Sequence, residues 1–313
     1  MNLQQIRQYM PWIALVVLVA LVGIANPGFL RPANLLGLAG DIVPLFIMAL
    51  GLTFAIYIGG IDLSVQSMAN MITVVASVYL ASLGGWVAVL CVGAGFALGM
   101  LSGFVTTRLF VPSFISTLAV GGICFSIAQW LSGNRALNMD AEQRNAVFGW
   151  MIGRTGIIPN ELFIAGALLA ICLFIERRTT LGRAFKAVGA GELAARASGI
   201  NVARYKILAF AISGALAAIA GLMFSVKLSG GAPTIANGFL LPAIVAVLVG
   251  GTPLTGGVGG VLNTMIGTLI VAVIRASMLY FGIEATQQQM LFGLVLIVAI
   301  ATTIDRSKLR TVK

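Results

Sequence analysis

The chain has 313 residues, of which 59% are hydrophobic and 9% are charged, whereas a soluble globular domain carries about 25% charged residues. One soluble core cannot hide so much apolar side-chain surface, which excludes an ordinary soluble fold and makes lipid the solvent for most of the exterior. The net charge of +10 does not indicate nucleic-acid binding, because the bases lie in short loops and at the chain ends and are not interleaved with aromatic residues on one face.

Ten apolar runs follow one another along the sequence, and each is predicted to form a membrane-spanning helix, which needs about 20 apolar residues. The first run follows a short head that contains Arg7 and precedes no cleavage site of small residues, so we expect a retained helix and no signal peptide. The predicted fold is an all-α integral membrane protein with about ten transmembrane helices in one domain, residues 1–313. The predicted spans are residues 11–25, 42–58, 65–83, 86–106, 112–131, 157–175, 207–226, 240–258, 261–281 and 290–303.

The distribution of the bases predicts the orientation, because lysine and arginine are retained on the cytoplasmic side of a membrane. An even number of spans puts both termini on one side. With the N-terminus in the cytoplasm, 13 of the 19 lysines and arginines fall on the cytoplasmic side. We therefore expect cytoplasmic N- and C-termini, an outer loop at residues 132–156 and a strongly basic inner loop at residues 176–206. The six bases that fall outside are Arg31, Arg135, Arg144, Arg154, Lys227 and Arg275.

A carboxylate lies between two apolar runs in the motif Gly59-Gly60-Ile61-Asp62-Leu63-Ser64. At membrane depth such a group costs about 2.5–3.5 kcal/mol and usually faces a cavity or a partner. The two glycines permit a break in the helix, and a membrane tolerates broken backbone only where protein or water satisfies it. Two interpretations stay open. One is a cytoplasmic interfacial turn in which Asp62 or Ser64 caps the next helix, and the other is a gate in a transport path. They overlap, since a cap can also be a gate.

The basic inner loop contains a short predicted helix, Glu192-Leu193-Ala194-Ala195-Arg196, with an acid–base pair four residues apart. Gly191 and Gly199 bracket it, at positions where helices start and stop. A simple surface helix would have the same sequence. Its predicted position beneath the spans makes it a natural contact for a cytoplasmic partner.

Residues 249–260 contain six glycines and Pro253, which cannot form an uninterrupted helix. We expect a broken or re-entrant helix, or close helix packing through small residues. A phosphate-binding loop is not indicated, because no lysine follows the glycines and no strand precedes them.

Catalytic and metal chemistry have little support in the sequence. There is no histidine, and Cys91, Cys124 and Cys172 each stand alone inside an apolar run. No cysteine pair has metal-ligand spacing, and a lone buried cysteine is usually a small hydrophobe. The sequence therefore predicts no metal, no cofactor and no enzymatic activity.

The motifs, taken together and in order, resemble the permease subunits of the ribose and related monosaccharide ABC importers, over about residues 27–305. The inner-loop and glycine-rich matches are Gly191-Glu192, Ala194-Ala195-Arg196, Ser198-Gly199-Ile200-Asn201, Gly250-Gly251-Thr252 and Gly256-Gly257. The earlier matches are the Asp62 motif, Pro112-Ser113-Phe114-Ile115 and Thr117-Leu118. The chain departs from the family pattern at Gln66, Ala190-Gly191, Pro253 and Thr255, which weakens any inference about the particular sugar.

The resemblance implies the type II importer fold in a bacterial inner membrane. It implies a cytoplasmic ABC ATPase, a periplasmic sugar-binding protein and a second permease subunit, identical or different, as partners. The segment Gly191, Glu192, Ala194, Ala195, Arg196 and Gly199 then resembles the coupling helix that docks on the ATPase. In that setting Ala194 and Ala195 are the expected contact positions.

Transport by alternating access then needs no covalent chemistry, and the binding protein supplies the affinity. Side chains with hydroxyl, amide or aromatic groups suit a neutral sugar, and the candidates for the path or its gate are Asp62, Ser64, Asn70, Thr73, Ser113, Phe114, Ser116 and Thr117. Three alternatives remain: a permease for branched-chain amino acids or nucleosides, an ion-coupled secondary transporter, and a membrane-embedded enzyme, for which the sequence offers no catalytic cluster.

Overall fold

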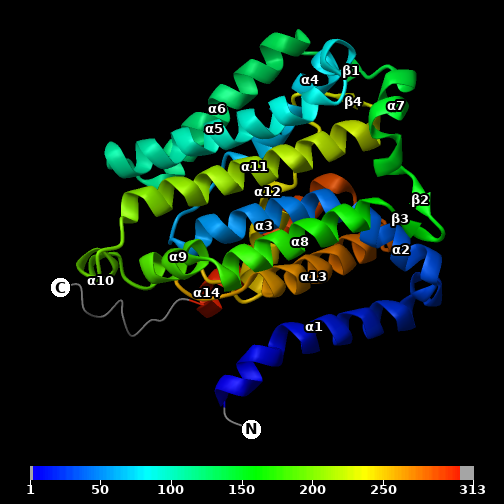
Figure 1. The fold of residues 1–313 in the computed structure, drawn as a ribbon. Coiled ribbons are helices and arrows are strands. Elements are labelled where there is room, and N and C mark those ends of the chain that lie inside the picture. Colours follow the sequence, from blue (N-terminus) through cyan, green and yellow to red (C-terminus); the bar gives the residue numbers. More distant parts are fainter. Residues whose placement is uncertain (1–2, 304–313) are drawn as a thin grey trace.

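The computed structural model describes residues 3–303, with the side chains of residues 11–284 and 287–300. Most helices lie side by side along one direction, and they form a bundle with two distinct ends (Figure 1). One end carries α9 and α10, and the other carries α7 and the short strands. The terminal bases Arg306, Lys308, Arg310 and Lys313 lie outside the described residues, as does the side chain of Arg7.

The chain forms fourteen α-helices, one 3-10 helix and four two-residue strands within the described residues. The elements of the first half are α1 (Leu3–Ala25), η1 (Pro27–Leu30), α2 (Pro32–Asp41), α3 (Val43–Tyr57), α4 (Val65–Leu83), α5 (Trp86–Arg108), α6 (Ser113–Ser132), β1 (Leu137–Asn138) and α7 (Ala141–Ile152). Those of the second half are β2 (Arg154–Thr155), β3 (Ile158–Pro159), α8 (Glu161–Arg178), α9 (Thr180–Ala190), α10 (Glu192–Ala197), α11 (Val202–Leu228), β4 (Gly230–Gly231), α12 (Leu240–Val249), α13 (Val261–Tyr280) and α14 (Ala285–Thr303).

A helix occupies each of the ten predicted runs, but the count of ten membrane spans is not confirmed. Among the described residues, five helices are long and apolar enough to cross a membrane. The number rises to six if α2 and α3, which are bent by 48° at their break, form one span. The run predicted at residues 240–258 is helical only to Val249, because the glycines and Pro253 end the helix there.

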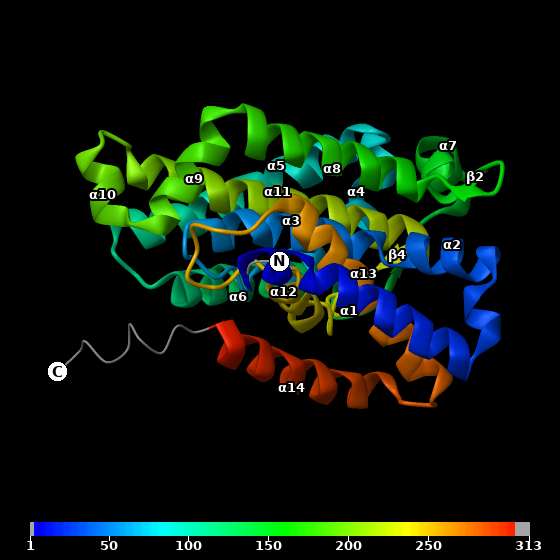
Figure 2. The ribbon, with the colours of Figure 1, turned by 90° about the horizontal axis from the view of Figure 1, so that it is seen from below.

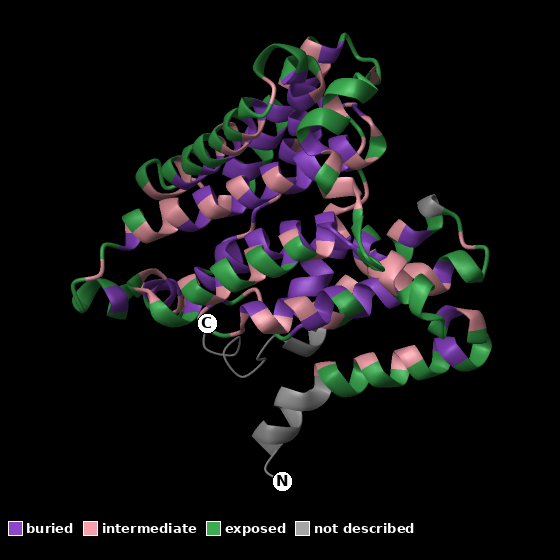
Figure 3. Cartoon of the chain, turned by 45° about the vertical axis from the view of Figure 1, so that its right-hand side comes forward, coloured by how far each residue is buried: buried purple, intermediate pink, exposed green. Residues whose placement is uncertain are grey.

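α11 is the central helix, and α3, α4 and α5 pack around it. The buried residues gather in the interior of the bundle (Figure 3), with many on α3, α4 and α11, whereas most of α5 is not buried. α5 approaches it through Gly95, Gly99 and Gly103, which recur every four residues and form a groove. A Cβ on Gly99 would lie 2.2 Å from the backbone oxygen of Phe210 on α11. This small-residue stripe was not predicted, although its spacing is visible in the sequence. α1 lies at the margin of the bundle in Figure 1, and α14 lies at its margin in Figure 2.

The two predicted long loops lie at opposite ends of the bundle. The outer loop is not irregular throughout: it forms α7, whose N-cap residue Asp140 accepts a hydrogen bond from the backbone N–H of Gln143 at 2.9 Å. β1 pairs antiparallel with β4, and β2 with β3. At the same end Lys227 pairs with Asp41 at 3.0 Å and with Glu161 at 2.8 Å, which ties α11 to α2 and α8.

Candidate gating and coupling site

α10 forms as predicted, as one short helix from Glu192 to Ala197 at one end of the bundle. Gly191 is its N-cap residue, and Gly199 just beyond it has a φ of +80°, a conformation that favours glycine. The predicted acid–base pair also forms, with 2.8 Å between Arg196 Nη2 and Glu192 Oε1.

The direction in which α10 faces corrects one prediction. Ala194 is exposed, but Ala195 is only 4% exposed and belongs to the hydrophobic core. Ala195 is therefore not a contact position for a partner, because the helix turns that side toward the protein. Leu193, which sequence reasoning missed, has 85% of its surface exposed and is the large apolar residue that α10 presents outward.

Glu192 connects α10 to the central helix. Its carboxylate accepts a hydrogen bond from Lys206 of α11 at 2.5 Å in addition to the bond from Arg196. The hydrogen bond from Lys206 is the largest effect on the pKa of Glu192 and lowers it, and the hydrogen bond from Arg196 also lowers it, against the opposing effect of burial. Both bonds favour the charged form of the carboxylate.

One face of α11 continues from this contact toward the Asp62 motif. Lys206, Phe210 and Ser213 are spaced by four and three residues, so their side chains share a face. The ring of Phe210 lies against Gly60, where a Cβ would come within 2.8 Å of the ring atom Cζ. The hydroxyl of Ser213 donates to Asp62 Oδ2 at 2.7 Å. One face of α11 therefore touches both α10 and residues 58–64.

Asp62 is completely buried, and three donors satisfy it. Besides Ser213, the backbone N–H of Ser64 donates to Oδ1 at 3.0 Å and the hydroxyl of Ser64 at 2.6 Å. Ser213 lies about 17 Å from the start of α11 and about 22 Å from its end, at a rise of 1.5 Å per residue. Asp62 therefore lies beside the middle of the central helix. Ser64 is the N-cap residue of α4 and makes no capping side-chain bond, whereas Asp62 accepts a hydrogen bond from the backbone N–H of Ser64.

The start of α6 holds the backbone of residues 58–64. The N–H of Ile61 donates to Ser113 Oγ at 3.2 Å, and the N–H of Leu63 donates to Thr117 Oγ1 at 3.1 Å. Two of the predicted residues, Ser113 and Thr117, thus contact the short segment that contains a third, Asp62. Ser116 is also buried but pairs with Thr106 of α5 at 2.6 Å, whereas Phe114 is 48% exposed.

Asn70 and Thr73 hold a different irregular segment, residues 229–239, between α11 and α12. Asn70 Oδ1 accepts from the N–H of Ala236 at 2.6 Å, and Thr73 Oγ1 accepts from the N–H of Ala232 at 3.2 Å. Gln66 Oε1 accepts from the N–H of Gly238 at 3.1 Å. These α4 side chains thus stabilise non-helical backbone, which accounts for polar residues in an apolar helix.

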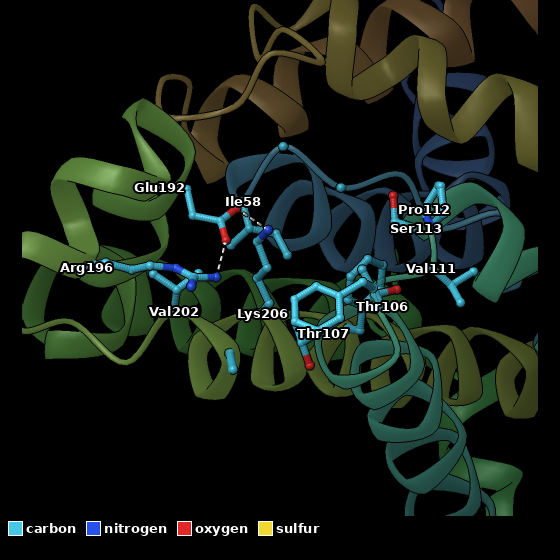
Figure 4. A pocket seen from close by; sticks show the side chains of 15 residues that line it. Ile58, Thr106, Thr107, Val111, Pro112, Ser113, Glu192, Arg196, Val202 and Lys206 are labelled. Atoms are coloured by element: carbon cyan, nitrogen blue, oxygen red, sulfur yellow. Dashed lines mark hydrogen bonds and ion pairs between the residues drawn. The ribbon is translucent and has the colours of Figure 1, made fainter.

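A cavity of about 370 Å³ lies between α10 and residues 58–60. Figure 4 shows the ion pair of Glu192 with Lys206 at one side of it and Ser113 with Pro112 at the other. Gly59 and Gly60 line it between them. The residues that link α10 to the Asp62 motif therefore surround one cavity.

The glycine-rich turn packs directly on the end of α3. The N–H of Gly257 donates to the carbonyl of Tyr57 at 2.9 Å. A Cβ on Gly189, at the end of α9, would lie 1.8 Å from the Tyr57 oxygen and 2.4 Å from Gly257 N. Three backbones meet here without side chains between them, immediately before α10. The predicted close packing through small residues is confirmed at this junction.

No group of three His, Cys, Asp or Glu side chains within the described part of the chain could hold a metal ion. The three cysteines are buried apart from one another as free thiols. The site consists of hydrogen-bonding and ion-pair contacts between helices and irregular segments, which is suited to controlled movement.

Residues 34–300 match the family model described as the permease component of a branched-chain amino acid transport system. The chain is 33% identical to the ribose import permease protein RbsC of Escherichia coli strain K12, over 92% of this chain and 91% of that protein. It is 32% identical to RbsC of Bacillus subtilis strain 168, over 95% and 92% of the two chains. It is 31% identical to the L-arabinose transport system permease protein AraH of Escherichia coli K12, over 94% and 89%.

Proposed function

Because the chain belongs to the family of permease components of transport systems, we propose that it is the permease subunit of an ABC importer for a monosaccharide. The observation that carries the proposal is the similarity to ribose and arabinose permeases over more than nine-tenths of the chain. The family description also names branched-chain amino acids, but the three relatives reported above are named as ribose or L-arabinose permeases.

ATP hydrolysis belongs to a separate cytoplasmic ATPase in this proposal, because the sequence contains no nucleotide-binding motif. α10 is the coupling helix, and its exposed Leu193 is the apolar anchor that enters a groove of the ATPase. Interface anchors of this kind carry a large share of the binding energy. A rigid-body movement of the docked helix then reaches the spans.

Residues 58–64 are the gate that this movement opens and closes. The support is the continuous face of α11, where Lys206 contacts Glu192 on α10 and Ser213 contacts Asp62 in the gate. The gate is held to α6 by hydroxyl groups of Ser113 and Thr117. Hydrogen bonds to hydroxyls can be exchanged for others at small net cost, so the gate has two accessible arrangements and the transporter alternates its access.

The remaining partners are a periplasmic sugar-binding protein on the α7 end, a second permease subunit, identical or different, and membrane lipid. The protein is placed in a bacterial inner membrane with both termini in the cytoplasm. The separation of the basic α9–α10 region from the mixed-charge α7 region supports this orientation. Reporter fusions after Arg144 are expected to be periplasmic and those after Arg196 cytoplasmic, and the reverse pattern would overturn the orientation.

The test is reconstitution in liposomes with and without the ATPase and the binding protein with which this chain assembles. The complete assembly is expected to accumulate a labelled monosaccharide, from a panel that includes ribose and arabinose, in an ATP-dependent manner, and to leave leucine and valine outside. Accumulation of the amino acids alone would establish the amino-acid alternative. Uptake by this chain alone, driven by an ion gradient, would establish a secondary transporter.

A further inference from the structure

A second cavity of about 580 Å³ has an arginine in its lining. Gly59 and Gly60 of the gate line the first cavity, and Gln66, at the start of α4, lines the second. Most of the other polar lining comes from the segment before α12 and from α14. The polar residues that line the second cavity are Gln66, Asn237, Arg275, Gln288 and Gln289.

Arg275 is the unusual member of this set, because it lies within helix α13. It is about 21 Å from the start of that helix and about 7 Å from its end. Among the described residues it makes no ion pair and no hydrogen bond, and its guanidinium carbon lies 4.4 Å from the ring centre of Phe239. A charged group within an apolar membrane helix usually faces a cavity or a partner. The stacked ring holds the guanidinium plane and leaves its N–H groups free to face the cavity.

Three of the four amide side chains, those of Asn237, Gln288 and Gln289, are hydrogen-bonded at one end and unoccupied at the other, whereas both ends of the Gln66 amide are bonded. Gln289 Nε2 donates to the carbonyl of Gly238 at 2.8 Å, and Asn237 Oδ1 accepts from Asn70 at 2.9 Å. Gln288 Nε2 donates to the carbonyl of Ile283 at 3.3 Å. Within the described residues, Asn237 Nδ2 and the amide oxygens of Gln288 and Gln289 have no hydrogen-bond partner. The cavity therefore presents anchored donors and acceptors, together with the ring of Phe292.

We propose that this cavity is a solute-binding station of the translocation path, in which Arg275, Asn237, Gln288 and Gln289 hold the hydroxyl groups of a neutral monosaccharide. The proposal rests on the proposed import function and adds a site and a solute class to it. A hydroxyl both donates and accepts, which matches the free groups here, and a guanidinium offers a planar fork to two adjacent oxygens. None of the residues described as lining the cavity is acidic, so the ammonium of an amino acid would have no counter-charge.

The closeness of the station to the gate in the chain has a consequence for transport. Solute released from the binding protein must be retained until the gate moves, or ATP is hydrolysed without transport. Gln66 lies four residues after Asp62, so the station and the gate share one continuous stretch of chain. Loss of the station is therefore expected to uncouple transport from hydrolysis while docking of the loaded binding protein stays intact.

The experiment uses the complete assembly in liposomes with the monosaccharide that the unaltered protein accumulates. Arg275→Gln is expected to lower the sugar molecules moved per ATP at least tenfold, with an unchanged KM for the loaded binding protein and unchanged stimulation of hydrolysis. Arg275→Lys keeps the charge but loses the fork, so at least a fivefold loss is expected. The control Arg31→Gln removes an exposed arginine from the turn before α2 and is expected to stay within twofold.

The outcomes separate this proposal from the function on which it rests. If the unaltered assembly moves no sugar, the import function fails. If it moves sugar and Arg275→Gln does so with the same yield per ATP, the station is overturned. Where Arg275→Gln does not assemble, Arg275→Lys decides: an assembled lysine variant with full yield would show that only the charge is needed and would equally overturn the station.

Discussion

Two irregular segments lie against each other at the end of α3, and they are stabilised in opposite ways. Residues 58–64 contain one glycine with positive φ, Gly59 at +71°, and their polar groups are held by hydroxyls from α6 and α11. Residues 250–260 contain four such glycines, at Gly251, Gly256, Gly257 and Gly259. There the contact with Tyr57 is made by backbone atoms.

The difference indicates which segment can move. A hydroxyl can exchange one hydrogen-bond partner for another by rotation, whereas a junction of three backbones tolerates little displacement in close-packed surroundings. We infer that the glycine-rich turn is a fixed pivot and residues 58–64 the moving part. Two segments with similar composition signals, both rich in glycine, thus have different mechanical roles.

The largest effect is expected from a methyl group at the pivot. In Gly189→Ala the new Cβ would lie 1.8 Å from the Tyr57 oxygen, and α3 and α9 would have to separate. The yield of monodisperse protein in detergent, measured by size-exclusion chromatography, is expected to fall more than tenfold. The control is Gly122→Ala on α6, where a Cβ meets nothing within 4 Å. A normal yield of Gly189→Ala would show that the junction is adaptable and no pivot.

The next largest effect is expected from a change in the proposed coupling helix α10. Leu193→Glu places a charge at the exposed apolar residue of α10, and loss of an anchor at an interface centre costs about 2 kcal/mol or more. Retention of the ATPase in a pull-down and sugar uptake are both expected to fall more than tenfold, with a normal yield of folded permease.

The matched control for Leu193→Glu is Ile157→Glu, which alters an apolar residue that is 73% exposed in the β2–β3 turn at the opposite end. It is expected to retain the ATPase fully. Equal retention in the two variants would mean that α10 is only a surface helix, and that the coupling contact lies elsewhere.

A smaller effect is expected within the gate. Asp62→Asn keeps the shape of the side chain but replaces a carboxylate that accepts three hydrogen bonds by an amide with one acceptor atom. A hydrogen bond to a charged group contributes about 1.5–3 kcal/mol. Uptake is expected to fall about tenfold with normal ATPase retention. Glu142→Gln on α7, exposed, is the control, and uptake of Asp62→Asn at the control level would remove Asp62 from the mechanism.

Periodicity and composition predicted the helices well, because each apolar run is long and its ends carry glycine, proline or charge. The small helix at residues 192–197 was also predictable from its glycine brackets. The count of ten spans is not confirmed, since α12 has ten residues and α2 and α3 are bent by 48° at their break. α2 and α9 were not predicted, and α7 was missed although Asp140 precedes it as a capping residue.

The sequence predicted several residues of the candidate site, but not how these residues contact one another. Hydroxyl and carboxyl residues in apolar runs identified Asp62, Ser113 and Thr117, yet their contacts depend on how α6 and α11 pack around the break. The burial of Ala195 depends on which side of α10 faces the core, and a six-residue helix has too little periodicity to show it. Arg275 was counted among outer bases, because sequence alone does not reveal a polar cavity beside α13.

The central claim is that residues 58–64 move relative to α6 during transport. It can be tested by a disulfide between Ile61→Cys and Ser113→Cys, whose parent residues are linked by a backbone-to-hydroxyl hydrogen bond of 3.2 Å, in a chain with the three native cysteines replaced by alanine. ATP-dependent sugar uptake by the complete assembly is expected to stop on oxidation and to return on reduction. Undiminished uptake with the disulfide fully formed would contradict the account.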